Sequence, residues 1–458
     1  MQAAELGTKK VPGRNLRKVT GIIVGAVALL LIGGTGFLRS TGPGADVSAS
    51  APAPETLLRT TLAGGDADAA VATLQERVRL NPEDAEALTS LGLAEVQRAR
   101  STADPAAYPR AEQALLQAQR LERADGAPTY QTLVGLGALS LARHDFSAAE
   151  RHGRAAAELN PFDGDVFGVI GDAQIELGRY NAAFSTFQRM VDTEPGVAAY
   201  SRVSYARELQ GDTSGAIEAM TQAESAAGSA SDAAWAAFHT GELRRGSGDV
   251  AGAARDYRRA VTLDPSFVPA QAGLARIAYV RGDLDRAIAG YEEVVARYPA
   301  AEHLIWLSEL LQAAGRTQEA DQQRDVVRAI QQLSAANGVN VDLEIALFEA
   351  DHGDPAIALR AAQAEWERRH SIHVADAMAW ALHANGNDRA ALAFSRRALH
   401  LGTRDALLLY HAGMIRLGLS DSDGALRDLR SALRIDPNFS ALHAPIAERT
   451  VARLGGAA

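Results

Sequence analysis

Apolar residues between positions 163 and 196 follow two helical patterns separated by a glycine. The first pattern includes Phe167 and ends at Gly178, and the second includes Phe187 and ends before Pro195. Apolar residues that recur three or four positions apart predict amphipathic helices. Each helix is too short to bury its apolar face alone, and the same frame recurs along most of the chain. The sequence therefore predicts stacked helix pairs that share one core.

Prolines mark the end of the second helix in many of these units, because proline cannot continue a helix. Pro161 and Pro195 are 34 residues apart, and so are Pro265 and Pro299. The longer gaps are close to multiples of this period, apart from a surplus that we assign in part to a loop at residues 101–109. The prolines assigned to unit ends are Pro82, Pro161, Pro195, Pro265, Pro299 and Pro437.

A second regularity is a glycine followed five residues later by an alanine. We expect the glycine to end the first helix in a left-handed conformation, which costs glycine little. We expect the alanine where two helices approach too closely for a larger side chain. The pairs are Gly65/Ala70, Gly178/Ala183, Gly211/Ala216, Gly248/Ala253, Gly282/Ala287, Gly315/Ala320, Gly353/Ala358 and Gly386/Ala391.

This combination of a 34-residue period, glycine and alanine at fixed offsets and a closing proline resembles the tetratricopeptide repeat family. The resemblance covers residues 55–439 and implies an all-α, right-handed superhelical solenoid of about eleven helix-turn-helix units. A capping helix is expected at residues 440–454, within a C-terminal region that ends at residue 458. Other helical solenoids are the alternative. The resemblance is strongest in residues 164–196, 234–267, 268–300 and 406–439, and weaker in residues 301–337 and 338–371.

The first 54 residues do not share this pattern. Residues 1–19 are basic and are interpreted as a cytoplasmic tail, and residues 39–54 as a flexible linker. Residues 20–38 contain no charged side chain, and as a helix they would be about 28 Å long, enough to cross a bilayer. Five basic residues precede this stretch and one follows it, so the positive-inside rule predicts a cytoplasmic N-terminus and an extracytoplasmic repeat array.

Two other interpretations of residues 20–38 are open. A cleaved signal peptide would explain the small residues near position 48, although these lie well past the apolar run. A buried core helix would need an apolar stretch unlike any other in the chain. An uncleaved single-pass anchor in the cell membrane is the preferred interpretation.

Composition excludes several kinds of chemistry. The chain has no cysteine, so it has no disulfides and no thiolate metal sites. No lysine follows Lys18, which excludes a P-loop lysine and a Schiff-base lysine. Residues 41–458 carry a net charge of about −15 against −10 for the whole chain, which does not suit nucleic-acid binding. We expect no enzymatic activity and no cofactor.

In tetratricopeptide repeat proteins the first helix of each unit lines a concave groove, and the resemblance implies a groove for a protein or peptide partner here. Aromatic and arginine side chains anchor many such interfaces. The charged run at residues 365–369 is interpreted instead as the exposed end of a second helix. The expected partner-binding residues are Asp172, Tyr205, Glu208, Trp235, Glu242, Arg276, Tyr279, Trp306, Glu309 and Trp380.

Histidines are concentrated near the C-terminus. His373, Asp376 and His383 share one helical face, and His411 begins the next unit. Imidazole and carboxylate groups at this spacing could hold a divalent metal ion, form a pH-sensitive patch or simply pack. The sequence gives a candidate metal site without deciding among these alternatives.

These features together predict a non-catalytic, membrane-anchored scaffold that mediates protein–protein interaction at the cell envelope. The alternative is a metal- or ligand-responsive accessory protein of an envelope transporter or enzyme, which would use the histidine-rich face. A catalyst has no supporting group of residues. Metal binding by the purified protein would separate the first two hypotheses.

Overall fold

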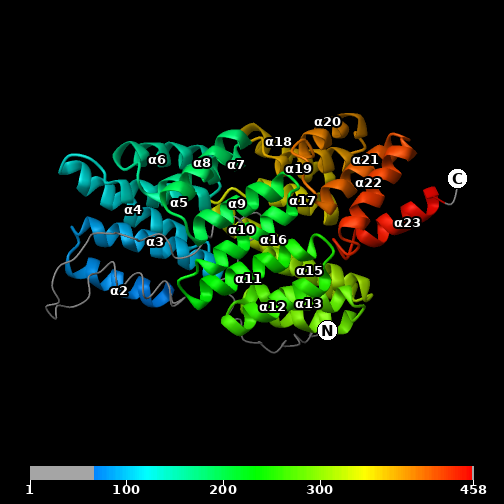
Figure 1. Ribbon diagram of the computed structural model, residues 1–458, viewed down its shortest axis with the longest axis horizontal. Coiled ribbons are helices and arrows are strands. Elements are labelled where there is room, and N and C mark those ends of the chain that lie inside the picture. Colours follow the sequence, from blue (N-terminus) through cyan, green and yellow to red (C-terminus); the bar gives the residue numbers. More distant parts are fainter. Residues whose placement is uncertain (1–66, 456–458) are drawn as a thin grey trace, which may run out of the picture.

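The computed structural model describes residues 67–455, which form 22 α-helices and no β-strand. The helices from α3 to α22 make ten consecutive pairs, with α2 before them and α23 after them (Figure 1). The helices of a pair pack on each other, and each second helix packs on the first helix of the next pair. The result is an all-α solenoid that fits the tetratricopeptide architecture.

The first helices of the ten pairs alternate along the chain with the second helices. The first helices are α3 (Ala85–Thr102), α5 (Tyr130–Ala142), α7 (Gly164–Glu176), α9 (Val197–Leu209), α11 (Ala230–Arg245), α13 (Val268–Val280), α15 (Ala301–Ala313), α17 (Asp342–His352), α19 (Ile372–Ala384) and α21 (Ala406–Gly418). The second helices are α4 (Ala107–Ala124), α6 (Phe146–Leu159), α8 (Tyr180–Thr193), α10 (Thr213–Ser225), α12 (Val250–Leu263), α14 (Leu284–Arg297), α16 (Thr317–Ala336), α18 (Pro355–Arg368), α20 (Asp388–Ala398) and α22 (Ser422–Ile435). The remaining two are α2 (Ala67–Leu80) and α23 (Ala444–Gly455).

The predicted membrane arrangement is corrected by this structure. Between residues 67 and 455, no helix combines the length and the apolar character needed to cross a membrane. The expected span at residues 20–38 lies outside the described residues. The fold class is therefore an all-α solenoid, and a transmembrane helix and a single-pass placement with an extracytoplasmic array are not retained.

The unit formed by α7 and α8 shows why the sequence folds into closely packed pairs. A Cβ atom on Gly171 of α7 would lie 2.3 Å from the ring of Phe187 on α8, so only glycine admits that ring. Gly178 then ends the first helix with a φ of 76°. Ala183 is completely buried on α8, where the two helices approach most closely.

The pattern of a glycine followed five residues later by an alanine, which we call the glycine and alanine ladder, has the expected conformation and burial, with one exception among the described pairs. Eight alanines of these pairs are described: the seven from Ala183 to Ala391 are completely buried, and Ala70 is 2% exposed. Six of the seven described glycines have positive φ angles between 74° and 87°. Gly353 differs, with a φ of −145°. Gly65, the first glycine of the ladder, lies outside the described residues.

The solenoid coils tightly enough for one of its turns to touch the next. Hydrogen bonds join Tyr298 to Arg100 and Arg245 to Asp436, across 198 and 191 residues respectively. The contact of Glu176 at the end of α7 with Arg369, which follows α18, spans 193 residues, and that of Tyr180 at the start of α8 with Ile372 of α19 spans 192 residues. In Figure 1 the helices α17 to α19 accordingly lie beside α7 and α9. The nearly constant separation, just under six 34-residue units, is the length of one superhelical turn.

The end of the chain departs from the repeat. Helix α22 ends at Ile435, and residues 436–443 form turns without helix before α23 begins at Ala444. Helix α23 lies at one end of the molecule in Figure 1 and packs on α22. We call residues 436–443 the C-terminal segment. The described part of the chain therefore holds ten complete pairs and a single preceding helix, close to the predicted eleven units.

Candidate functional site

Four successive first helices, α9, α11, α13 and α15, carry most of the predicted partner-binding residues. These residues lie on the side of the four helices that meets the second turn of the solenoid. We call this side the inner face. Because these helices belong to consecutive units, their side chains form one continuous strip. The strip contains Tyr205, Glu208, Trp235, Glu242, Arg276, Tyr279, Trp306 and Glu309.

An ionised carboxylate lies at the centre of the inner face. Glu242 accepts hydrogen bonds from Arg245 Nη2, at 2.9 Å, and from the hydroxyl of Tyr257 on α12. Burial opposes the ionisation of Glu242, but the charges of Arg245 and Arg276 and these hydrogen bonds outweigh burial and lower its pKa to about 2. Glu242 therefore orients Arg245, whose Nη1 is left to bind another carboxylate.

An arginine stacked on aromatic rings continues the strip on α13 and α15. The guanidinium of Arg276 lies 4.0 Å from the centre of the Trp306 ring, a cation–π contact. Trp306 stacks on Tyr291 of α14 with an angle of 7° between the ring planes, and Tyr279 meets Trp306 edge-on. These rings fix the guanidinium in place, so its N–H groups point in set directions.

The C-terminal segment lies on this part of the inner face. Arg245 Nη1 donates to Asp436 Oδ2 at 2.7 Å, and Arg276 Nη2 donates to the carbonyl oxygen of Phe439 at 2.9 Å. The hydroxyl of Ser440 donates to Glu309 Oε2 at 3.3 Å. Three of the expected partner-contacting helices, α11, α13 and α15, thus each bind the chain's own end.

The other predicted partner-binding residues of α7, α9 and α11 have different surroundings. Asp172 is buried and pairs with Arg202, whose Nε and Nη2 lie 2.8 and 2.6 Å from its two oxygens. The Tyr205 hydroxyl lies 3.2 Å from His373 Nε2. Glu208 is exposed, but protein surrounds it closely enough for burial to raise its pKa to about 7. Trp235 is half-buried beside His239, with ring centres 4.1 Å apart.

Trp380 belongs to a separate group of aromatic and histidine rings on α19 and α21. It is buried, and its indole N–H donates to Asp351 Oδ1 at 2.6 Å. His411 stacks on Trp380 with ring centres 4.0 Å apart, and His443 of the C-terminal segment meets Trp380 edge-on. His443 Nε2 also lies 3.2 Å from Asp351. This group ties the C-terminal segment to the second turn.

The four predicted metal ligands have separate partners. His411 Nδ1 lies 2.8 Å from Asp376 Oδ2, whereas His383 lies beside Asp388. His373 is instead directed to Tyr205 of the first turn. Within residues 67–455, no group of three or more histidine, aspartate or glutamate side chains could hold a metal ion. The metal site stays a prediction from the sequence, without a ligand cluster to support it.

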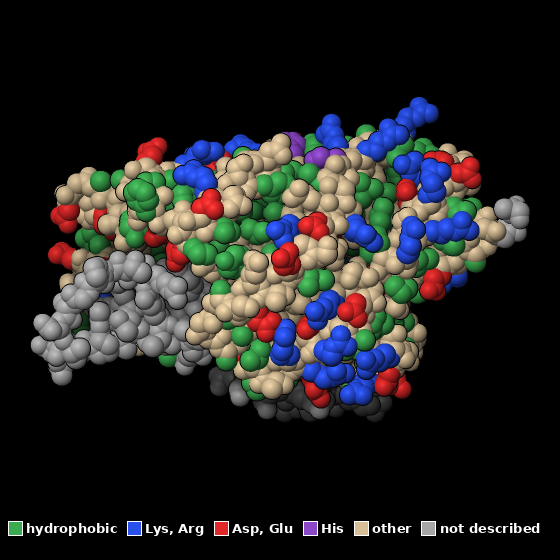
Figure 2. Space-filling model, in the orientation of Figure 1, with side chains coloured by type: hydrophobic (Ala, Val, Ile, Leu, Met, Phe, Trp, Pro, Cys, Tyr) green, Lys and Arg blue, Asp and Glu red, His purple; other side chains and the backbone are tan. Residues whose placement is uncertain are grey.

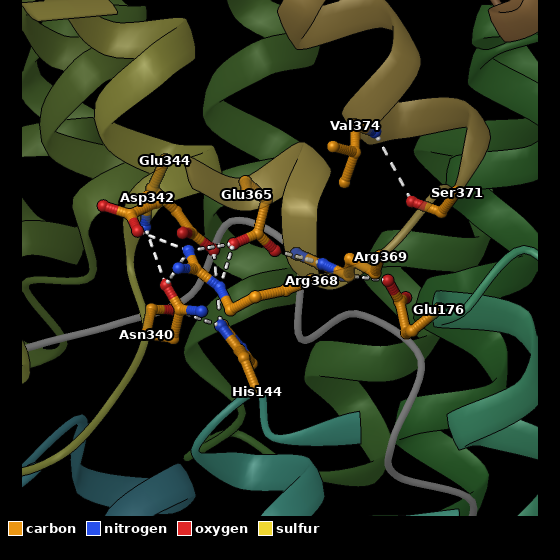
Figure 3. A network of polar contacts seen from close by, with 10 residues as sticks. All are labelled: His144, Glu176, Asn340, Asp342, Glu344, Glu365, Arg368, Arg369, Ser371 and Val374. Atoms are coloured by element: carbon orange, nitrogen blue, oxygen red, sulfur yellow. Dashed lines mark hydrogen bonds and ion pairs between the residues drawn. The ribbon is translucent and has the colours of Figure 1, made fainter. Parts of the chain in front are cut away.

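Arg369 is the residue whose place differs most from its predicted one. The sequence suggests an exposed helix end, but the side chain is 1% exposed and binds both Glu365 and Glu176, which belongs to the other turn. Figure 3 shows these contacts within a larger network between the turns. In it, His144 Nδ1 lies 2.7 Å from the carbonyl oxygen of Asn340. The predicted exposed helix end is therefore wrong at Arg369, because helical periodicity describes a single helix and could not reveal the second turn.

Glu344 is the least satisfied member of this network. Neither of its carboxylate oxygens has a hydrogen-bond partner among the described residues, and both are buried. Burial is the main cause of its raised pKa, about 7, and Glu365 and Glu176 add to it, whereas Arg369 opposes the increase. Sequence reasoning missed this group and the contacts of the C-terminal segment. The contacts of the C-terminal segment with the inner face join residues that are 131 to 191 positions apart, so they are visible only in the fold.

Family models described as tetratricopeptide repeat match residues 134–198, 205–266 and 244–304. These matches support the tetratricopeptide repeat family for the chain. The fold and the family together give a helical repeat scaffold suited to protein–protein interaction.

Among curated proteins, the chain is similar to the cellulose synthase 1 operon protein C of Komagataeibacter xylinus. The two are 26% identical over 228 residues, which are 47% of this chain and 17% of that protein. Solved structures with a similar arrangement include the human IFIT1 dimer (TM-score 0.45, 12% identity, 83% of this chain and 90% of that chain). The yeast Tom70 structure is a second (TM-score 0.35, 14% identity, 87% of this chain and 88% of that chain).

Proposed function

We propose that this chain is a non-catalytic scaffold that binds a protein partner on the inner face of α9 to α15. The observation that carries this proposal is the continuous strip of aromatic and charged side chains on four successive first helices. Tryptophan, tyrosine and arginine are the side chains that most often dominate the energy of protein interfaces. The match to the tetratricopeptide repeat family supports the same function.

The part of the inner face on α9 and α11 offers two side chains to a partner. Trp235 is half-buried, and its ring contact among the described residues is with His239. Glu208 is exposed, and its pKa is raised because the attraction of nearby positive charge does not offset the cost of ionising it among protein atoms. A basic side chain of a partner would favour the ionised form of Glu208, while an apolar side chain would cover Trp235. We propose a partner segment with both kinds of side chain.

The test is recovery of bound proteins by the full chain and by two variants. The first variant carries Trp235→Ala and Glu208→Gln on the inner face. The second, a matched control, carries Arg258→Ala and Glu293→Gln, which change two exposed residues of the second helices α12 and α14. Figure 2 shows basic and acidic side chains interspersed on the surface in the region of α12 and α13.

A protein that binds to the full chain and to the control variant, but not to the inner-face variant, would support the proposal. Direct binding of that protein must then be measured by calorimetry with purified components. Equal recovery by all three baits would contradict the proposal, because the binding surface would then lie away from Trp235 and Glu208. Circular dichroism must show the same helix content for the three proteins.

A further inference from the structure

The C-terminal segment is a buried stretch without helical structure in a molecule that is otherwise made of helices. Asp436, Phe439, Ser440, Ala441 and His443 are all buried, although residues 436–443 form only turns. The side chains of Asp436 and Ser440 accept from backbone N–H groups of the segment itself, at residues 438, 442 and 443. The place of the segment in the molecule depends on its contacts with the surfaces around it. The surface that receives the start of this segment is the inner face.

Each first helix from α11 to α15 makes one defined contact with the segment. Arg245 on α11 binds the Asp436 carboxylate, and Arg276 on α13 binds the carbonyl oxygen of Phe439. Glu309 on α15 accepts from the hydroxyl of Ser440. Successive contacts thus advance along the segment as the helices advance along the solenoid.

The spacing of these contacts suits a chain that lies across the helices. Residues 437 and 438 form a turn, and a step of three residues reaches at most about 10 Å, which is close to the distance between packed helix axes. Asp436 and Phe439, three residues apart, accordingly reach the neighbouring first helices α11 and α13. An apolar contact follows, because Ala441 packs in a cluster that includes Ala272 of α13 and Leu307 of α15.

The inner face is organised for this contact by residues of its own. Glu242 holds Arg245 through Nη2 and leaves Nη1 for Asp436. Trp306 stacks under Arg276 and leaves Nη2 for the Phe439 carbonyl. Two fixed arginines, Glu309 and an apolar patch describe a site that recognises a carboxylate, a backbone carbonyl three residues later, and then a serine and an alanine. The Phe439 ring itself packs on Tyr410 of the last unit.

The segment is not part of any helix pair. It lies after the last helix pair, and the helix that follows it, α23, packs on α22 at the end of the molecule. Moving the segment would break its own contacts and those of α23, and it would uncover the rings of Trp380 and Tyr410, against which His443 and Phe439 pack.

We propose that the inner face of α11, α13 and α15 is a peptide-binding site for the pattern Asp-x-x-x-Ser-Ala, and that the C-terminal segment is its resident ligand. A partner segment with this chemistry replaces residues 436–443. The proposal rests on the proposed function, since it names the partner chemistry of the same face. It also adds a regulatory element, because the resident segment competes with the partner for the site.

The experiment uses a fluorescent synthetic peptide with the sequence of residues 434–445 and the full chain. The wild-type chain should bind the peptide weakly, because its own segment occupies the site at a high effective concentration. A chain with Asp436→Asn and Phe439→Ala should bind it at least tenfold more tightly by fluorescence anisotropy. Adding Arg276→Ala to that chain should remove the gain, and a peptide carrying the same two substitutions should not bind.

A folded Asp436→Asn, Phe439→Ala chain that binds the peptide no better than the wild type would overturn the proposal. Binding that survives Arg276→Ala would also overturn it, because the peptide would then be held elsewhere. If the double variant loses helix content, the single variant Asp436→Asn replaces it, with an expected gain of at least threefold. The two proposals can fail separately. If the Trp235→Ala, Glu208→Gln variant loses its partner but the peptide does not bind to α11, α13 and α15, this proposal is refuted and the proposed function stands.

Discussion

At the scale of single residues, the closest packing occurs where a large ring meets glycines. The ring of Tyr257 on α12 is completely buried between Gly241 of α11 and Gly273 of α13. A Cβ atom on Gly241 would lie 2.6 Å from this ring, and one on Gly273 would lie 2.9 Å from it. The same ring carries the hydroxyl that binds Glu242, so helix packing and the charge distribution of the inner face depend on the same side chain.

The substitution Gly241→Ala should destabilise the protein. Alanine has the higher helix propensity, by about 1 kcal/mol, but the buried Tyr257 ring cannot move away from the new methyl group. Overpacking of this kind costs about 1–3 kcal/mol. Urea denaturation measures the difference. The matched control is Gly196→Ala, where a Cβ atom would meet no atom within 4 Å and the stability should change by less than about 0.5 kcal/mol. Equal stability of the two variants would contradict this account.

Asp172 and Arg202 should behave as one buried unit. Removing the guanidinium by Arg202→Met leaves a buried carboxylate without its partner, which costs about 3–5 kcal/mol. The double variant with Asp172→Asn should be more stable than the sum of the two single effects predicts. Denaturation of the four proteins completes this cycle. Strictly additive effects would show that the pair is not coupled and that Asp172 is available to a partner after all.

At the scale of helices, the repeat pattern in the sequence predicts most of the helices and how they pair. Each ladder glycine and alanine acts within one unit, which is why residues such as Gly178 and Ala183 could be assigned from spacing alone. Contacts between turns could not be assigned in this way. They depend on a small rotation per unit that accumulates over almost six units, and neither Arg369 nor Asp436 carries a local sign of it. The candidate site was therefore predicted as a strip of residues, but its resident segment was not.

The network between α5, α7, α17 and α18 should make stability depend on pH. The raised pKa of Glu344, about 7, means that the folded protein keeps a proton that the unfolded chain loses near pH 4.5. Its contribution is complete below that pH and is lost as the pH rises through 7. The groups that face it are His144, Arg369, Glu365 and Glu176.

The free energy of unfolding should therefore fall between pH 6.5 and 8, by on the order of 1 kcal/mol from Glu344 alone. Glu302, with a pKa of about 8, and Glu208 act in the same direction. The lowered pKa values of His239 and His303, about 4, have the opposite effect, but only below about pH 6.5. Denaturation at several pH values should show a smaller decrease for Glu344→Gln than for the control Glu293→Gln. An identical decrease in both variants would exclude Glu344 as the cause.

At the scale of the whole molecule, contact between the two turns changes how the solenoid should unfold. In a simple repeat array each unit contacts only its neighbours, so the array can unfold in parts. Here Arg369 joins α18 to Glu176 of α7, and the Tyr180 hydroxyl accepts from the backbone N–H of Ile372 at 2.6 Å. Such contacts make the stability of one turn depend on the other, so the two turns should unfold together.

The variant Arg369→Ala with Tyr180→Phe removes this connection and leaves each helix pair intact. Glu176 and Glu365 then repel each other without the guanidinium between them, which favours separation of the turns. Small-angle scattering should show a larger radius of gyration, with helix content unchanged. Urea unfolding should become broader and the m-value smaller, because partly unfolded states become populated. The control Arg258→Ala should keep the wild-type transition. If the double variant also keeps it, packing of the units within each turn is sufficient for cooperative unfolding, and the contacts between the turns contribute little to it.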